Sequence, residues 1–175
     1  MLSASVTATD AERRATLPGD DVVPDASVVM DRAFTVTGTP DEVWPWFVQL
    51  GKARAGWYLP RIVERWVPRD RRAYRTIEPG LQELAVGDVI PDWGGKDATF
   101  TVAALTPPRS LVHVSTRGRV RLSWAITLSG STTTRVHLRL RLGGVRRVRL
   151  ARVAGGFFDW LTIVGLAAGL RERLR

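Results

Sequence analysis

Two consecutive segments in the second half of the chain alternate between apolar and polar residues, and this alternation constrains the fold more than any other feature. In residues 120–128, and again in residues 135–142, apolar side chains recur at every second position. Because successive side chains of a strand point to opposite faces of a sheet, each segment has one face suited to a core and one suited to water. A short turn at 129–131 separates them. The pattern predicts two neighbouring strands of an antiparallel sheet that is covered on one side.

Further strands are expected before this pair. Segments rich in β-branched residues predict strands at residues 28–37, 99–105 and 111–116, and a short strand that ends near Ile90. Pro107-Pro108 separates two of them, because proline cannot continue a hydrogen-bonded ladder. These segments therefore predict a sheet of several antiparallel strands.

Two short helices are predicted after the first strand. Thr39 can cap the first helix, and Glu42 completes a capping box around Pro40. Four residues at helical spacing should face the core: Val43, Trp46, Phe47 and Leu50. The second helix is expected near residues 60–66. Its apolar residues, Ile62, Val63 and Trp66, are predicted to face inward.

A long C-terminal helix is predicted from about Val153 to Leu174. Residues 153–170 carry one charge, Asp159, and are close to the length of a membrane span. A carboxylate near the centre of a bilayer would cost about 2.5–3.5 kcal/mol, which weighs against a span. Glycines at 155, 165 and 169 would instead allow close packing, so we expect the helix to lie across the sheet.

The length and composition set bounds on the class of protein. A chain of 175 residues is most simply one domain, and we predict a polar N-terminal arm at residues 1–26 followed by a single domain at residues 27–175. The sequence contains no cysteine, which excludes disulfides, thiolate zinc sites and cysteine nucleophiles. The first thirty residues have no apolar signal-peptide core, so a cytoplasmic location is predicted.

Positive charge is concentrated in the second half of the chain. Residues 1–87 sum to −1 and residues 88–175 to +10, and 24 of the 26 basic residues are arginine. This asymmetry indicates either an anionic partner or an arginine-rich, solvated sheet face. The tract from Arg135 to Arg152 lacks the interleaved aromatic residues that stack on bases, so no specific nucleic-acid binding is predicted. Contact with an anionic membrane remains an alternative, because the adjoining helix is apolar.

Aromatic residues gather between residues 44 and 58, which hold three of the seven tryptophans and one of the two tyrosines. Large aromatic side chains can line a pocket while an N–H or O–H group orients a ligand. This stretch therefore predicts a binding cavity.

Short motifs in residues 8–91 resemble the bacterial SRPBCC proteins, relatives of START domains and polyketide cyclases. The motifs are Ala8–Glu12, Leu17–Asp21, Val43–Gly51, Gly56–Tyr58 and Leu81–Asp88. The resemblance implies an α+β helix-grip fold, in which a curved antiparallel sheet wraps around a long C-terminal helix and two short helices follow the first strand. It also implies a deep internal cavity suited to a lipid, a polyketide or another apolar small molecule. No cofactor is predicted.

The residues predicted to line this cavity are Trp46, Trp57, Tyr58, Phe100, His113, Trp124 and Trp160. Carriage of a hydrophobic ligand is the first interpretation. An enzyme of the cyclase or dehydratase type is the alternative, with His113 and Asp159 as acid–base candidates.

The catalytic alternative depends on two residues whose surroundings the sequence leaves open. An inward-facing His113 could act as a general base, or it could be a core histidine held by a hydrogen bond. Asp159 could have a raised pKa, or it could form an ion pair with Arg54, Arg61 or a strand arginine. His137 shares its strand face with three arginines and is expected to be solvent-exposed. No cluster of residues has metal-ligand spacing, so no metal site is predicted.

Overall fold

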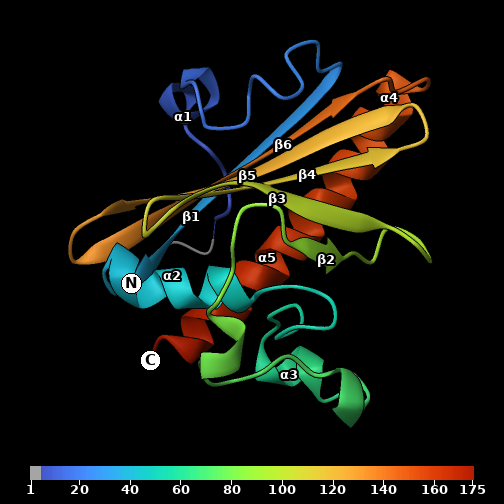
Figure 1. Ribbon diagram of the computed structural model, residues 1–175. Helices are drawn as coiled ribbons and strands as arrows, with labels where there is room; N and C mark the ends of the chain where they lie inside the picture. Colours follow the sequence, from blue (N-terminus) through green and yellow to red (C-terminus); the bar gives the residue numbers. More distant parts are fainter. Residues whose placement is uncertain (1–4) are drawn as a thin grey trace.

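Six strands form one antiparallel sheet in the computed structural model, which describes residues 5–175 (Figure 1). The spatial order is β1-β6-β5-β4-β3-β2, so the first strand pairs with the last. The strands are β1 (Val28–Thr37), β2 (Val89–Pro91), β3 (Thr99–Thr106), β4 (Ser110–Arg117), β5 (Val120–Gly130) and β6 (Thr133–Gly143). All the strands predicted from the sequence are therefore present.

The register of β5 and β6 confirms the alternation. Trp124 pairs with Leu140, and Ile126 pairs with Leu138, so apolar side chains meet on one face of the sheet. We call this the inner face. Ser123 pairs with Arg141 on the opposite, outer face. A one-residue slip would move every apolar side chain to the wrong side, so the inner face specifies the register.

The first helix after β1 is α2 (Pro40–Gln49), and it forms as expected. Its Thr39 cap and Glu42 bond each other reciprocally in a capping box. The four residues predicted to face the core are all buried: Val43, Trp46, Phe47 and Leu50.

The second helix, α3 (Arg61–Glu64), has the opposite orientation to the predicted one. The three apolar residues predicted to face inward are exposed: Ile62 and Val63 in the helix, and Trp66 just after it. Glu64 is buried instead, because Arg75 and Arg173 each donate to its carboxylate at 2.6 Å. A carboxylate that accepts two guanidinium groups is satisfied inside the protein, and it turns the short helix away from the expected face.

The C-terminal helix is continuous from Val148 to Arg173. It consists of α4 (Val148–Leu150), one π-helical turn at Ala151–Gly155, and α5 (Gly156–Arg173). By length and composition alone it could cross a membrane, and 28% of its most apolar stretch is buried. The buried residues lie in its second half, which packs on the inner face of the sheet (Figure 1): Ile163, Leu166, Ala167, Gly169 and Leu170. The predicted packing of the helix across the sheet is confirmed for this half.

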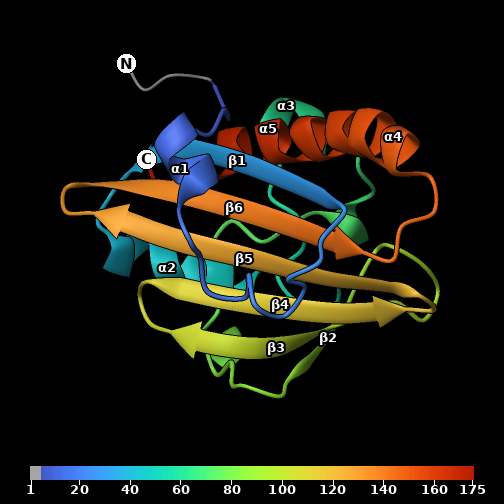
Figure 2. The same cartoon turned by 90° about the horizontal axis from the view of Figure 1, so that it is seen from above.

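An N-terminal arm, residues 5–26, covers the outer face of the sheet (Figure 2). It contains α1 (Asp10–Arg14) and passes over β6, β5 and β4. Three of its own apolar residues are buried, Val6, Ala8 and Val23, and Val6 joins the main hydrophobic core. The arm therefore lies on the side of the sheet opposite to α5.

The arm corrects the expectation of a solvated arginine face. Arg139 is only 3% exposed and donates to the Asp20 carboxylate and to the backbone carbonyls of Glu12, Arg13 and Ala15. Arg135 forms an ion pair with Glu12 at 2.7 Å. The sequence could not reveal this cover, because the partners are separated by more than one hundred residues.

His137 is also buried, contrary to the expectation that it is exposed. Its Nε2 atom lies 2.7 Å from Asp31 Oδ1, and Arg139 Nε donates to the same oxygen at 2.8 Å. These two partners hold the pKa of Asp31 below its usual range although burial opposes them. The three residues form a buried polar network between the sheet and the arm.

Candidate functional site

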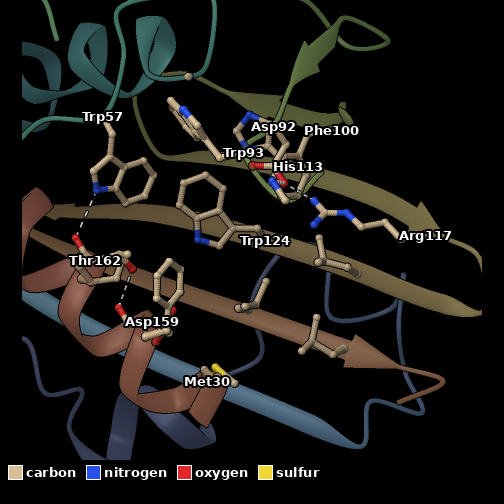
Figure 3. A pocket seen from close by; sticks show the side chains of 18 of the residues that line it. Met30, Trp57, Asp92, Trp93, Phe100, His113, Arg117, Trp124, Asp159 and Thr162 are labelled. Atoms are coloured by element: carbon tan, nitrogen blue, oxygen red, sulfur yellow. Dashed lines mark hydrogen bonds and ion pairs between the residues drawn. The ribbon is translucent and has the colours of Figure 1, made fainter. Parts of the chain in front are cut away.

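A cavity of about 670 Å³ lies between the inner face of the sheet and the first half of the C-terminal helix (Figure 3). One wall comes from β4, β5 and β6, through residues such as His113, Trp124 and Leu140. The helix supplies the facing wall, through Gly155 and Phe158. Most of the lining side chains are apolar, and this size is typical of small-molecule sites.

Five rings form an aromatic cluster on the cavity wall: Trp57, Trp93, Phe100, His113 and Trp124. Trp124 stacks against His113 with ring centroids 5.5 Å apart, and against Trp57 at 6.1 Å. Trp93 meets Trp57 edge to face at 5.9 Å. The rings come from a loop after α2, from the β2–β3 connection and from three strands, so the fold assembles the cluster from distant segments.

His113 is a buried, neutral member of this cluster. Burial lowers its pKa to about 4, and the positive charge of Arg54 acts in the same direction. Its Nδ1 atom has no hydrogen-bond partner within residues 5–175. The imidazole is therefore uncharged at neutral pH and retains hydrogen-bonding capacity.

Asp159 lies on the helix wall and is paired. Arg32, which comes from β1, donates through Nε to Asp159 Oδ2 at 2.7 Å and through a terminal nitrogen to the Gly156 carbonyl at 2.8 Å. Burial raises the pKa of Asp159, and Arg32 opposes the increase. Of the partners predicted, the strand arginine is the correct one.

His113 and Asp159 do not meet. Figure 3 shows them on different walls, with Trp124 between them. Among the described residues, no hydrogen bond joins them. A shared acid–base pair of the kind that the catalytic alternative needs is therefore not assembled.

Five of the eight predicted ligand or catalytic candidates do line the cavity: Trp57, Phe100, His113, Trp124 and Asp159. Trp57 is oriented by its Nε1–H, which donates to the Thr162 carbonyl of α5 at 3.3 Å. The loop after α2 is thereby attached to the helix at the edge of the cavity (Figure 3).

Three residues predicted to line the cavity do not. Trp46 and Tyr58 belong to the core: the Tyr58 hydroxyl donates to the Trp46 carbonyl at 2.8 Å, and their rings meet edge to face at 5.5 Å. Arg173 covers the other side of Tyr58, 4.7 Å from its ring centroid. Trp160 points outward and is 43% exposed. A buried ring can pack in the core or line a cavity, and the sequence pattern predicts only its burial. Trp46 and Tyr58 were therefore assigned to the cavity.

Several lining residues were not predicted. Trp93 stands in a glycine-rich loop, where an apolar ring surrounded by polar residues was a signal that could have been used. Arg117 and Asp92 form an ion pair at one end of the cavity. Met30 and Leu140 are neighbours across β1 and β6, which becomes apparent only when the strand order is known. Within residues 5–175, no group of three or more histidine, aspartate and glutamate side chains is arranged to hold a metal ion.

Comparisons with known proteins identify the fold. No protein-family model and no curated protein matches the sequence. Among solved structures, protein MLL2253 from Mesorhizobium loti is similar, with 18% identity and a TM-score of 0.51 over 85% of this chain and 99% of that chain. A point mutant of norcoclaurine synthase from Thalictrum flavum, in complex with a transition-state analogue, is also similar. It has 10% identity and a TM-score of 0.51 over 84% of this chain and 93% of that one. At these identities the likeness shows the helix-grip fold alone.

Proposed function

We propose that this chain binds an apolar, ring-containing small molecule in the cavity between its sheet and its C-terminal helix. The supporting observation is the 670 Å³ cavity with its aromatic cluster. Tryptophan faces favour flat ligands, because offset stacking adds to the free energy gained by burying apolar area. We also propose that the chain is a cytoplasmic member of the SRPBCC superfamily, in keeping with the motifs in residues 8–91.

An uncharged ligand fits this site better than an ion. The charged lining groups already have partners, since Asp92 and Arg117 pair with each other and Asp159 pairs with Arg32, and His113 is neutral. A ligand charge buried there would lack a counter-ion and would carry a large desolvation cost. A ligand hydroxyl or carbonyl, by contrast, could use the free hydrogen-bonding capacity of the imidazole.

Binding can be tested with N-phenyl-1-naphthylamine, a neutral probe whose fluorescence rises in apolar surroundings. Leu140→Trp places an indole inside the cavity, because Leu140 lines it. Val86→Trp adds the same ring on the surface, where Val86 is 62% exposed. We expect the first variant to lose at least tenfold in probe affinity and the second to bind like the unmodified chain. Equal binding by both variants, each with an unchanged circular dichroism spectrum, would place the probe elsewhere.

The natural ligand can be sought directly. Protein purified under native conditions is denatured, and the organic extract is analysed by mass spectrometry. We expect a compound that is enriched over the Leu140→Trp extract and that is dominated by ring or alkyl carbon. An extract that matches the variant's in every component would count against an occupied cavity.

Carriage is proposed in preference to catalysis because His113 and Asp159 are not joined. In a carrier, His113→Ala should keep the probe affinity within about threefold, since an alanine removes one contact among many. A carrier should also release the extracted compound unchanged after prolonged incubation. Conversion of that compound by the unmodified chain, lost in His113→Ala, would instead establish an enzyme.

A further inference from the structure

The first half of the C-terminal helix exposes an unusual amount of apolar surface. Val153 is 75% exposed, Phe157 63% and Phe158 67%. The apolar residues of this segment with large exposed fractions are Leu150, Val153, Phe157, Phe158, Trp160 and Leu161, and we call them the mouth patch. A run of this kind on one element marks an interaction surface, whereas single exposed apolar residues do not.

The mouth patch adjoins the cavity. Phe158 belongs to the patch and also lines the cavity, and the same helix contributes Ala151 and Gly155 to the lining. Trp93, from the connection between β2 and β3, also lines the cavity and is 52% exposed. Exposed aromatic rings therefore flank the cavity from two different elements.

Positive charge without an ion pair is concentrated at the start of the same helix. Arg146, Arg147, Arg149 and Arg152 are exposed and precede or begin the helix. The ion pairs within residues 5–175 include none of these four, whereas the arm supplies carboxylates to Arg135 and Arg139. The excess charge that the sequence places in its second half is thus concentrated beside the mouth patch rather than across the sheet.

We propose that the mouth patch and its four arginines dock this protein on an anionic lipid bilayer, with the cavity opening toward the membrane. Aromatic rings and arginine are the residues that favour the interface between headgroups and acyl chains. Anionic headgroups complement the four arginines, and an acidic protein surface would match the charges without accommodating six apolar side chains. This inference rests on the proposed function. If the cavity binds an apolar ligand, docking lets that ligand pass between the bilayer and the cavity without crossing water.

Vesicle flotation tests the docking. The full chain is mixed with vesicles of phosphatidylcholine alone or of equimolar phosphatidylcholine and phosphatidylglycerol. We expect flotation with the anionic vesicles and its loss as salt rises, because salt screens the headgroup charges. The triple substitution Arg146→Gln, Arg147→Gln, Arg149→Gln should weaken binding about a hundredfold, since each arginine contributes about fivefold. Phe157→Ser with Trp160→Ser should abolish flotation at every salt concentration.

A matched control is available in the segment just after α3. Trp66 is 79% exposed, and Arg69 and Arg71 are exposed arginines near it. The combination Trp66→Ser, Arg69→Gln, Arg71→Gln removes an exposed indole and two charges far along the chain from the mouth patch. We expect it to float like the unmodified chain.

Three results would overturn the docking proposal. The first is no flotation with anionic vesicles, and the second is an equal loss in the control and mouth-patch variants. The third is a dimer in solution that Phe157→Ser dissociates, because a second copy would then cover the patch. All variants are also measured for probe binding without vesicles. Probe binding without flotation contradicts only the docking, whereas failure of the unmodified chain to bind the probe contradicts the proposed function.

Discussion

Three buried polar side chains of this protein depend on partners from distant parts of the chain. Glu64, His137 and Arg139 are all at most 5% exposed, although the sequence pattern places none of them in the interior. Each is satisfied by partners from distant segments. Without knowledge of its partners, a polar residue in an alternating pattern is assigned to the solvent-exposed face. Spacing along the chain does not reveal those partners.

His113 provides a prediction about pH at this scale. Its pKa is about 4 in the folded chain and near 6.5 in an unfolded one, so the unfolded chain binds more protons between these values. Stability is therefore lost as pH falls from 7, by about 2 kcal/mol at pH 5 from this residue. We expect His113→Leu to remove that loss. Urea unfolding at pH 7 and pH 5 measures it, and an unchanged pH dependence in the variant would contradict it.

At the scale of elements, the sequence was most reliable where periodicity was strong. The β5 and β6 strands, the α2 helix and its capping box were predicted with the correct inner faces. The α3 helix was placed correctly, but its buried face was predicted wrongly. A four-residue helix has too short a periodic pattern to reveal that Glu64 is buried by two ion pairs. The cavity was predicted from the resemblance and the aromatic stretch, but only five of the 23 residues that line it could be named. The rest depends on the strand order, which places Met30 beside Leu140.

The C-terminal helix permits a matched test of close packing. A Cβ on Gly169 would lie 2.6 Å from the Leu59 backbone nitrogen, whereas a Cβ on Gly156 would meet nothing within 4 Å. We expect Gly169→Ala to cost about 2 kcal/mol of unfolding free energy, because backbone must shift. Gly156→Ala should gain up to about 1 kcal/mol from helix propensity. Thermal unfolding of both variants checks the pair, and equal melting temperatures would refute the close approach.

For the whole molecule, the arm is the feature that sequence reasoning left most incomplete. It was predicted as a polar extension, but its contacts with the sheet make it a cover for the outer face. The acidic first half and the basic second half of the sequence meet there: Glu12 with Arg135, and Asp20 with Arg139. Charge asymmetry that resembled a partner-binding signal is therefore partly satisfied within the chain.

Removal of residues 1–26 should destabilise the protein without emptying the cavity, which lies on the opposite face of the sheet. We expect a loss of about 3–5 kcal/mol, from lost burial of Val6 and Val23 and from lost ion pairs. Urea unfolding measures the loss, and probe binding should persist in the truncated chain below its unfolding transition. A truncated chain with an unchanged midpoint would show that the arm adds no stability.

Point variants test the contribution of single ion pairs between the arm and the sheet. Arg135 lowers the pKa of Glu12 to about 2, so this ion pair persists in mild acid and is lost as pH falls from about 4 toward 2. Glu12→Gln should remove about 1 kcal/mol at pH 7 and little at pH 2. Asp10→Asn, at a side chain that is 77% exposed, is the control and should be neutral at both values. Urea unfolding of Glu12→Gln and Asp10→Asn at pH 7 and pH 2 measures these differences.

The long sequence separation of these contacts determines the order in which the molecule can be assembled. Glu12 and Arg135 are 123 positions apart, and β1 pairs with β6, the last strand to be synthesised. Residues near Thr7 can pair with β1 early, but the part of the arm that contacts Arg135, Arg139 and Arg141 has no partner until residues 133–143 have emerged and paired. Closing so large a loop is slow, because the chain loses conformational entropy before any stabilising contact forms. Protection from solvent of Val23, whose carbonyl accepts from Arg141 of β6, thus reports that the last strand has paired.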